Sequence, residues 1–304
     1  MRRLAVVVIL LLIASFATTA LVAPKTKNRI LIRSADAVER LLRPIEFKAA
    51  YQPFFKRVLL LAQRGLGSGR DDMGSSGEAV ALLAYRDRVL ATRPDRIVLF
   101  DIGAFEGEYT DVLLSAFAAD APVEIHAFEP APQAFGALSA RLGSTPHLHL
   151  VNAALGEAAA TLALHVDPSP KMNSLVERPH LKGTLATIDV PVITLDEYCA
   201  QNAISHVDIL KLDVEGYEMN VLKGAKTFLA RRAIRIIQFE YGGFALANKV
   251  MFHDLFALLG GDFDIFRIVG DGFEPIPPGS GVWEQNGIGG NYAAFLKPAP
   301  STGS

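Results

Sequence analysis

The chain has 304 residues, half of them apolar, which is enough to bury one large core or two modest ones. Its formal net charge of −2 shows no basic excess, so the composition argues against a nucleic-acid partner. The single cysteine, Cys199, excludes a framework of intramolecular disulfides.

An uncharged apolar run follows Arg2 and Arg3 near the start of the chain. As a helix, residues 4–23 would span about 30 Å, roughly the hydrocarbon core of a bilayer. Because the run is longer than the apolar part of an ordinary signal peptide, we favour an uncleaved transmembrane anchor. Basic residues after the run outnumber those before it, which places the rest of the chain in the cytoplasm. The alternative is a signal segment that is cleaved near Thr18-Thr19-Ala20 and leaves an exported protein.

Residues 24–95 are predicted to form a helical extension that contains a loop, which would close over a bound ligand. Apolar residues recur at helical spacing, and Pro44 and Pro53 interrupt the pattern. The extension divides into a helical stretch, a loop rich in glycine, serine and aspartate, and a second helix, at residues 28–64, 65–77 and 78–91.

From residue 96 the pattern changes to short apolar runs that alternate with helical stretches. Seven strands are predicted, at residues 97–102, 123–128, 148–153, 207–213, 234–240, 263–269 and 291–297. Helices are predicted between most of them, at residues 110–119, 132–142 and 218–230. This alternation predicts an α/β fold with a doubly wound, mostly parallel sheet over residues 96–298.

An insertion at about residues 157–195 separates the third strand from the fourth. Its segments 161–166 and 187–195 have the pattern of paired β-strands around a polar loop. A short tail, residues 299–304, is expected to be disordered.

Acidic residues end four of the predicted parallel strands. Ligands of such sheets bind beyond the carboxyl ends of the strands. Single acids there are explained by helix capping, but four together suggest a ligand that donates many hydrogen bonds. They are Asp101, Glu129, the pair Asp213 and Glu215, and Glu240.

The turn after the first strand distinguishes two classes of nucleotide cofactor. It reads D-I-G-A-F-E-G, with Gly103 and Gly107, and lacks the close glycine pair of a dinucleotide site. Asp101 and Glu106 would repel a pyrophosphate, whereas S-adenosylmethionine has none. Glycine allows the backbone to approach the methionyl part, and Glu129 is placed to accept hydrogen bonds from the ribose hydroxyls.

Seven stretches then follow one another in order: SGE (76–78), VLFDIGAFEGEYT (98–110), HAFEPAP (126–132), VNAALGE (151–157), ITLDEYC (193–199), DILKLDVEGYEMNVLKGAKTFL (208–229) and IIQFEYGG (236–243). Together they resemble the FkbM family of S-adenosylmethionine-dependent methyltransferases, and LDVEGYE with LKGA is the most specific part. One departure is Phe105, where the family usually has Asn.

The resemblance implies a class I, Rossmann-like methyltransferase that methylates a hydroxyl of a sugar or secondary metabolite. Because S-adenosylmethionine is then the expected cofactor, a cytoplasmic catalytic domain is also implied. The partners expected are a small-molecule or glycan acceptor, and the membrane through the N-terminal segment. Two alternatives are a nicotinamide-dependent oxidoreductase, which the missing G-x-G disfavours, and a non-catalytic binding protein on the same fold.

Residue by residue, the resemblance assigns the cofactor site. The methionyl part is expected near Asp101, Gly103 and Gly107, and the ribose at Glu129. The adenine is expected near Asn152 and Ala153, and closure from the N-terminal side by Gly77 and Glu78.

Asp213 and Glu215 are expected to face the reacting centre, because residues two apart on an extended segment project to the same side. One of them would be the catalytic base, or the pair would hold a divalent cation with Glu240. Alternatively, Asp213 only orients the cofactor ammonium and Glu215 caps the next helix. Other residues left open by the sequence are Asn173 and Ser174 as acceptor-pocket or turn residues, His165 and His180 as possible bases, and His126 and His206 as packing residues.

Overall fold

The computed structural model describes residues 33, 36–40, 42–67, 73–92, 94–117, 122–277 and 289–299. The chain divides into two compact units, Met1–Ala62 and Gln63–Ser304. The predicted apolar segment at residues 4–23 lies outside the described residues, as does most of the expected tail. Within the described part, no helix is long and apolar enough to cross a membrane.

In the first unit, the described residues include helical residues at 36–40, two 3-10 turns, η1 (Arg43–Ile45) and η2 (Ala49–Tyr51), and the start of α3 (Gln52–Gly65). The turns interrupt the stretch that is predicted to be helical. Pro44 and Pro53 lie in the first turns of η1 and α3. The missing N–H of a proline costs no intrahelical hydrogen bond there, because the first N–H groups of a helix have no partner within it.

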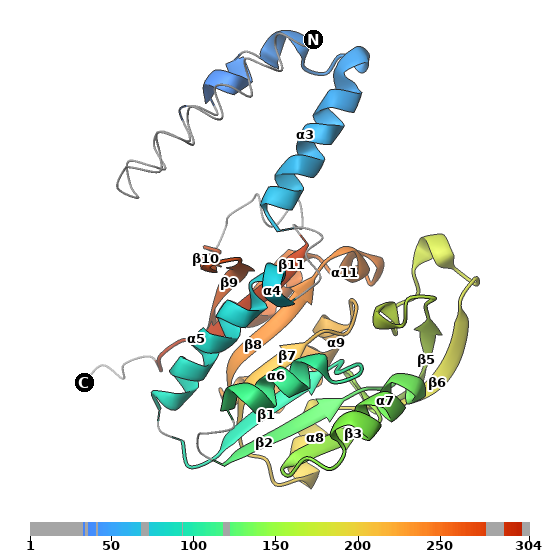
Figure 1. Cartoon of the computed structure of the whole chain (residues 1–304), viewed down its shortest axis with the longest axis vertical. Coiled ribbons are helices and arrows are strands. Elements are labelled where there is room, and N and C mark those ends of the chain that lie inside the picture. The colour runs from blue at the N-terminus through green and yellow to red at the C-terminus, as the bar shows by residue number, and fades with distance from the viewer. Residues whose placement is uncertain are drawn as a thin grey trace. The chain divides into compact units, whose positions relative to one another are not determined.

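The second unit is built on a central sheet of eight strands. In spatial order they are β10 (Gly272–Pro275), β9 (Phe263–Val269), β11 (Gly290–Leu296), β8 (Ile234–Tyr241), β7 (Val207–Leu212), β1 (Ile97–Ile102), β2 (Val123–Phe128) and β3 (Leu148–Val151). The strands from β8 to β3 pair in parallel, and β9, β10 and β11 pair antiparallel (Figure 1). The predicted doubly wound sheet is therefore confirmed.

The predicted count of seven strands is one too low. The missed strand, β10, is a four-residue edge strand that pairs antiparallel with β9. It reads Gly-Phe-Glu-Pro, so its glycine and proline give it the composition of a turn, and only its pairing with β9 makes it a strand.

Helices cover both faces of the sheet because the central strands are buried on both sides. All six residues of β1 and of β7 are buried, which explains their continuous apolar sequences. One face packs against α5 (Glu78–Leu90), α6 (Glu108–Phe117) and α7 (Pro132–Leu142). The other face packs against α8 (Leu195–Gln201), α9 (Glu218–Lys223), α10 (Lys226–Ala230) and α12 (Phe252–Leu259).

Two helices differ from the prediction. The segment 218–230 is broken into α9 and α10 at Gly224, where a Cβ would overlap the carbonyl oxygen of Gly156. The predicted loop 65–77 contains a short helix, α4 (Met73–Ser76). Because the compact unit begins at Gln63 and α5 packs into its core, the boundary expected at residue 95 lies inside this unit.

The insertion forms a small separate sheet. β5 (Ala160–Val166) and β6 (Ala186–Ile193) are paired, as predicted, and their pairing is antiparallel; β4 (Ala154–Leu155) adds to β6 in parallel. The connection between β5 and β6 contains the 3-10 turns η3 (Pro170–Met172) and η4 (Pro179–Leu181). A short helix, α11 (Gly243–Ala247), follows β8 in the sequence.

Candidate functional site

The turn after β1 lies at the point where the strand order reverses, between β1 and β7. Gly103 and Gly107 have φ of +84° and +85°, values that favour glycine. A Cβ at Gly103 would overlap the carbonyl oxygen of Asp213, and one at Gly107 would lie 2.6 Å from Leu138. The packing of the protein itself therefore requires both glycines, whatever they contact in a cofactor.

Phe105 adopts φ of +50° in the same turn. Asparagine tolerates this left-handed region better than phenylalanine does. The asparagine expected at this position is therefore explained by backbone geometry, which Phe105 adopts at a cost. The Phe105 ring lines a cavity and lies under the ammonium of Lys171, with 5.5 Å from Nζ to the ring centre.

Glu129 is held in place beside this turn by backbone donors. The amide of Phe105 donates to Oε2 at 2.9 Å, and that of Ala131 donates to Oε1 at 2.8 Å. The side chain is buried, and burial raises its pKa to about 7 against the lowering effect of these two donors. Each carboxylate oxygen has a further lone pair, so Glu129 can accept two more hydrogen bonds.

Asn152 and Ala153 follow β3 but are used differently. The Asn152 side-chain amide donates to the carbonyl oxygens of Glu129 and Pro130, at 2.8 and 3.2 Å. Ala153 lines the cavity with Glu129. Asn152 therefore fixes the segment that carries Glu129, while Ala153 forms part of the cavity surface.

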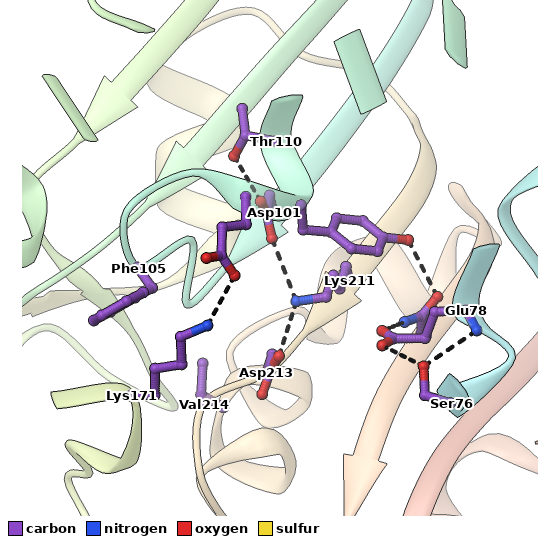
Figure 2. Close-up of polar contacts among 12 residues, drawn as sticks. Ser76, Glu78, Asp101, Phe105, Thr110, Lys171, Lys211, Asp213 and Val214 are labelled. Carbon is purple, nitrogen blue, oxygen red and sulfur yellow. Dashed lines mark hydrogen bonds and ion pairs between the residues drawn. The ribbon is translucent and has the colours of Figure 1, made fainter. Parts of the chain in front are cut away.

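A buried lysine connects the two acids at the ends of β1 and β7. Lys211 Nζ lies 3.0 Å from Asp213 Oδ2 and 3.7 Å from Asp101 Oδ1, and Thr110 donates to Asp101 Oδ2 at 2.6 Å (Figure 2). Asp101 is completely buried. It is therefore not exposed to the cavity, and its direct partners are Lys211 and Thr110.

The pKa values in this group follow from burial and from the opposite charges. Burial raises the pKa of Asp101, and Lys211 opposes the rise. Burial alone would lower the pKa of Lys211, but Asp213, Asp101 and Glu78 outweigh it and raise that pKa above its ordinary value. Lys211 therefore remains charged and serves as the common counter-ion of these acids.

Gly77 and Glu78, at the start of α5, adjoin this group rather than the cavity. A Cβ at Gly77 would overlap the carbonyl oxygen of Val269. Glu78 Oε1 accepts from the Gln238 amide at 2.6 Å, and Glu78 Oε2 accepts from the Ser76 hydroxyl at 2.9 Å (Figure 2). Burial raises the pKa of Glu78.

Three carboxylates converge beyond β7 and β8. Oxygens of Asp213, Glu215 and Glu240 lie within 4.8 Å of one another, a set that could hold a divalent cation. Burial, and after it the charge of Glu240, raises the pKa of Glu215 to about 9. Burial, and after it the charge of Asp213, raises the pKa of Glu240 to about 8. Glu215 has φ of +52°, so it reaches this position through a left-handed turn, and the extended segment assumed from the sequence is wrong.

A cavity joins the turn after β1 to these acids and to the insertion. Of the residues expected in the site, it is lined by Gly103, Glu129, Ala153, Asn173, Ser174, Asp213 and Glu215. Residues expected in the site but outside this lining are Gly77, Glu78, Asp101, Gly107, Asn152 and Glu240.

The insertion contributes one wall of this cavity. The hydroxyl of Ser174 donates to the backbone carbonyl of Glu215 at 2.7 Å, and Asn173 accepts from the amide of Asp167 at 2.9 Å. Lys171 also lines the cavity and pairs with Glu108 at 2.8 Å. The insertion is thereby tied to the loop that carries the acids.

Comparison with known proteins identifies the family. Residues 101–265 match the model of the Methyltransferase FkbM domain. The chain belongs to this family. The matched region begins at Asp101 and contains Glu129 and the three converging carboxylates.

Two curated relatives share part of the FkbM domain. The hexuronic acid methyltransferase AglP of Haloferax volcanii is 25% identical over 145 residues, which are 48% of this chain and 56% of the relative. The 2-O-methyltransferase NoeI of Sinorhizobium fredii is 25% identical over 165 residues, 50% of this chain and 65% of the relative. The chain thus spans less than two thirds of either. A solved FkbM methyltransferase from Methylobacillus flagellatus has 15% identity and a TM-score of 0.40, covering 66% of this chain and 44% of the other.

Lys211 is a residue of the candidate site in this FkbM domain that the sequence analysis did not single out. Its register explains its place: Asp101, Lys211 and Gln238 are paired across β1, β7 and β8, on the face covered by α5 and α6. A signal was present, because Lys211 interrupts an otherwise apolar run near the end of a buried strand.

The two histidines that the sequence left open as bases, His165 and His180, lie outside the lining of the cavity in this FkbM domain. His126 is buried in β2, as expected of a packing residue, whereas His206 is partly exposed and lies 3.4 Å from Asp208. His165 is in β5, and His180 is exposed in η4.

Proposed function

We propose that this chain is an S-adenosylmethionine-dependent O-methyltransferase that acts on a hydroxyl of a sugar. The observation that carries the proposal is Glu129, a buried carboxylate fixed by two backbone donors at the edge of a cavity, in a chain of the FkbM family. Its remaining lone pairs suit a ribose diol, which offers two hydroxyl donors.

The residues around Glu129 fit the rest of the cofactor. Gly103 and Asp213 would contact the methionyl part, and Ala153 and Leu155 supply an apolar surface for the adenine. The cofactor supplies the methyl group as a sulfonium when it is bound. Asp101 acts indirectly, because its carboxylate orients Lys211 and Lys211 in turn holds Asp213.

The three carboxylates beyond β7 and β8 would prepare the acceptor. A hydroxyl must lose its proton as it is methylated, and an ionised carboxylate of this cluster can take that proton or hold a cation that favours its loss. The raised pKa values of Glu215 and Glu240, about 9 and about 8, mean that protons must leave the cluster first. Both roles therefore give activity that rises with pH through this range.

The acceptor class is inferred from the relatives. The name of one relative specifies a hexuronic acid, which is a sugar, and the name of the other specifies methylation of an oxygen at a 2-position. The wall formed by Lys171, Asn173 and Ser174 adds one cation and two hydrogen-bonding side chains to the cavity, a composition that suits a polar acceptor.

The membrane anchor is proposed from the sequence alone. The uncharged run at residues 4–23 is long enough to span a bilayer and would hold the catalytic unit at the cytoplasmic face. Membrane fractionation with N-terminal sequencing tests this, and a soluble exported form that begins near Leu21 would contradict it.

The test of the activity is conversion of labelled S-adenosylmethionine to S-adenosylhomocysteine with neutral and uronic sugars as acceptors. We expect turnover with a sugar, and no binding of NAD in calorimetry. Turnover that is abolished by EDTA and restored by Mg²⁺ assigns the carboxylate cluster to a cation, and EDTA-resistant turnover assigns it to proton transfer. Asp213→Asn is expected to reduce turnover more than cofactor affinity. Binding of NAD without binding of S-adenosylmethionine would overturn the proposal.

A further inference from the structure

A second group of potential metal ligands lies away from the cavity, on strands β2 and β3. Glu124 and His126 are two apart in β2 and so point to the same face of the sheet, and His149 of β3 is the register partner of His126. The face is the one covered by α8, because Tyr198 of that helix contacts the His126 ring. Glu124 lies four residues before the end of β2, so this group is roughly 13 Å along the strand from the edge that carries Glu129.

Both imidazoles lie at the same oxygen of Glu124. His126 Nε2 and His149 Nε2 are each 3.3 Å from Glu124 Oε1. Two ligand atoms of a tetrahedral zinc ion, each at about 2.0–2.1 Å from the metal, are separated by about 3.3 Å. The other oxygen, Oε2, accepts from Arg96 at 2.9 Å, which fixes the carboxylate and leaves Oε1 for the two rings.

The hydrogen bonding of His126 provides an independent reason to expect a cation. The ring is buried and its Nδ1 lies 2.9 Å from the hydroxyl of Tyr198. Among the described residues, Nε2 has no hydrogen-bond partner although Glu124 Oε1 is 3.3 Å away. If Nε2 carries the proton, this N–H makes no hydrogen bond to the carboxylate oxygen. If Nδ1 carries it, the lone pair of Nε2 lies beside that oxygen with no donor between them. A cation between the two atoms satisfies both.

The chemistry of the ligands also fits zinc. Imidazole nitrogens and a carboxylate oxygen are ligand types that zinc binds in proteins. A bond from Nδ1 to Tyr198 would orient the ring in the way that outer partners orient metal-bound histidines. His149 is 49% exposed, which leaves room for entry of the ion and for a water as fourth ligand.

We propose that Glu124, His126 and His149 form a binding site for a zinc ion that joins strand β3 to β2. The rings of His126 and His149 are stacked with 4.6 Å between centres and 11° between planes. The exposed His149 ring must therefore turn about its side-chain bonds so that its Nε2 lone pair points to the ion. The site stabilises the edge of the sheet and is separate from the cofactor cavity.

The test is titration of the full-length protein, freed of metal with a chelator, with Zn²⁺ alone. Calorimetry should find one site that His149→Ala weakens at least tenfold, whereas His180→Ala, which removes an exposed histidine on η4, leaves it unchanged. Tyr198→Phe should weaken it about tenfold. The same titration of Asp213→Asn shows whether the carboxylate cluster binds zinc as well, because only that binding should be weakened in this variant.

Two further readouts make the result decisive. Co²⁺ in the same site should give the visible absorption of a tetrahedral ion in the unmodified protein and not in His149→Ala. If circular dichroism shows that His149→Ala does not fold, Glu124→Gln replaces it in every comparison. No zinc binding by the unmodified protein, or equal binding by the His149→Ala and His180→Ala variants, would overturn the proposal.

Discussion

Replacement of Glu129 by glutamine tests the cofactor assignment most directly. The side chain keeps its size but loses its charge and one acceptor oxygen. The two backbone amides that now donate to it, those of Phe105 and Ala131, would compete for a single oxygen, and the ribose would lose a charge-assisted hydrogen bond. Such a bond contributes about 1.5–3 kcal/mol, which corresponds to a rise of roughly 10- to 150-fold in the Kd for S-adenosylmethionine.

The pH dependence of binding gives a second, sharper signature. Because burial raises the pKa of Glu129 to about 7, its ionised fraction in the free protein increases about tenfold between pH 6 and pH 8. Hydroxyl donors favour the ionised form, so affinity should rise by up to the same factor over this range. Glu129→Gln should remove this part of the dependence.

Calorimetry with S-adenosylmethionine at pH 6, 7 and 8 measures both effects. Glu106→Gln is the matched control, because it removes an exposed carboxylate from the same turn. Its Kd should remain within twofold of that of the unmodified protein. Equal affinities for Glu129→Gln and Glu106→Gln, or a pH dependence that survives in Glu129→Gln, would refute the role assigned to Glu129.

The remaining predictions concern stability. Lys211→Met should lower the free energy of unfolding in urea by about 3–5 kcal/mol, since Asp101 then becomes a buried charge without a counter-ion. Lys223→Met, which replaces an exposed lysine, is the control. A similarly small effect of both substitutions would contradict this prediction. Gly103→Ala should cost about 2–4 kcal/mol because of its φ of +84° and the overlap with the Asp213 carbonyl, and an unchanged Tm would contradict it. Glu215→Gln should stabilise the cation-free protein by about 1 kcal/mol or more at pH 7.

The sign of the Glu215 prediction follows from the direction of its pKa shift. The folded-state pKa of about 9 exceeds the unfolded value of 4.5, so the unfolded chain releases this proton more readily. Stability therefore falls as the pH rises from about 5 to about 9, and Glu215→Gln removes that loss. Unfolding curves at pH 5, 7 and 9 should show that the free energy of unfolding of Glu215→Gln exceeds that of the unmodified protein by an amount that grows with pH. A difference that is constant or shrinks with pH would show that Glu215 is ionised in the free protein.

The sequence by itself determined the layered fold and the position of the cofactor turn. Strands such as β1 are apolar on both faces, and this local pattern predicts a parallel sheet covered by helices without knowledge of the partners. The turn could be located in the same way. Gly103 and Gly107 follow the apolar run of β1 in the sequence, and Glu129 follows that of β2. Edge strand β10 could not be located in this way, since its composition is that of a turn and only pairing defines it.

The roles of the polar residues were decided only by the tertiary structure. Asp101 and Lys211 are far apart in sequence, and the register of β1 with β7 makes them neighbours, so that an acid expected to face the cofactor instead anchors a buried lysine. Gly103 is required by the carbonyl of Asp213, a contact between two separate loops. Glu215 joins Glu240 through a left-handed backbone conformation that periodicity cannot reveal. Local patterns encode which face of an element is buried, whereas charges pair through space, and their partners are fixed only when the strands pack.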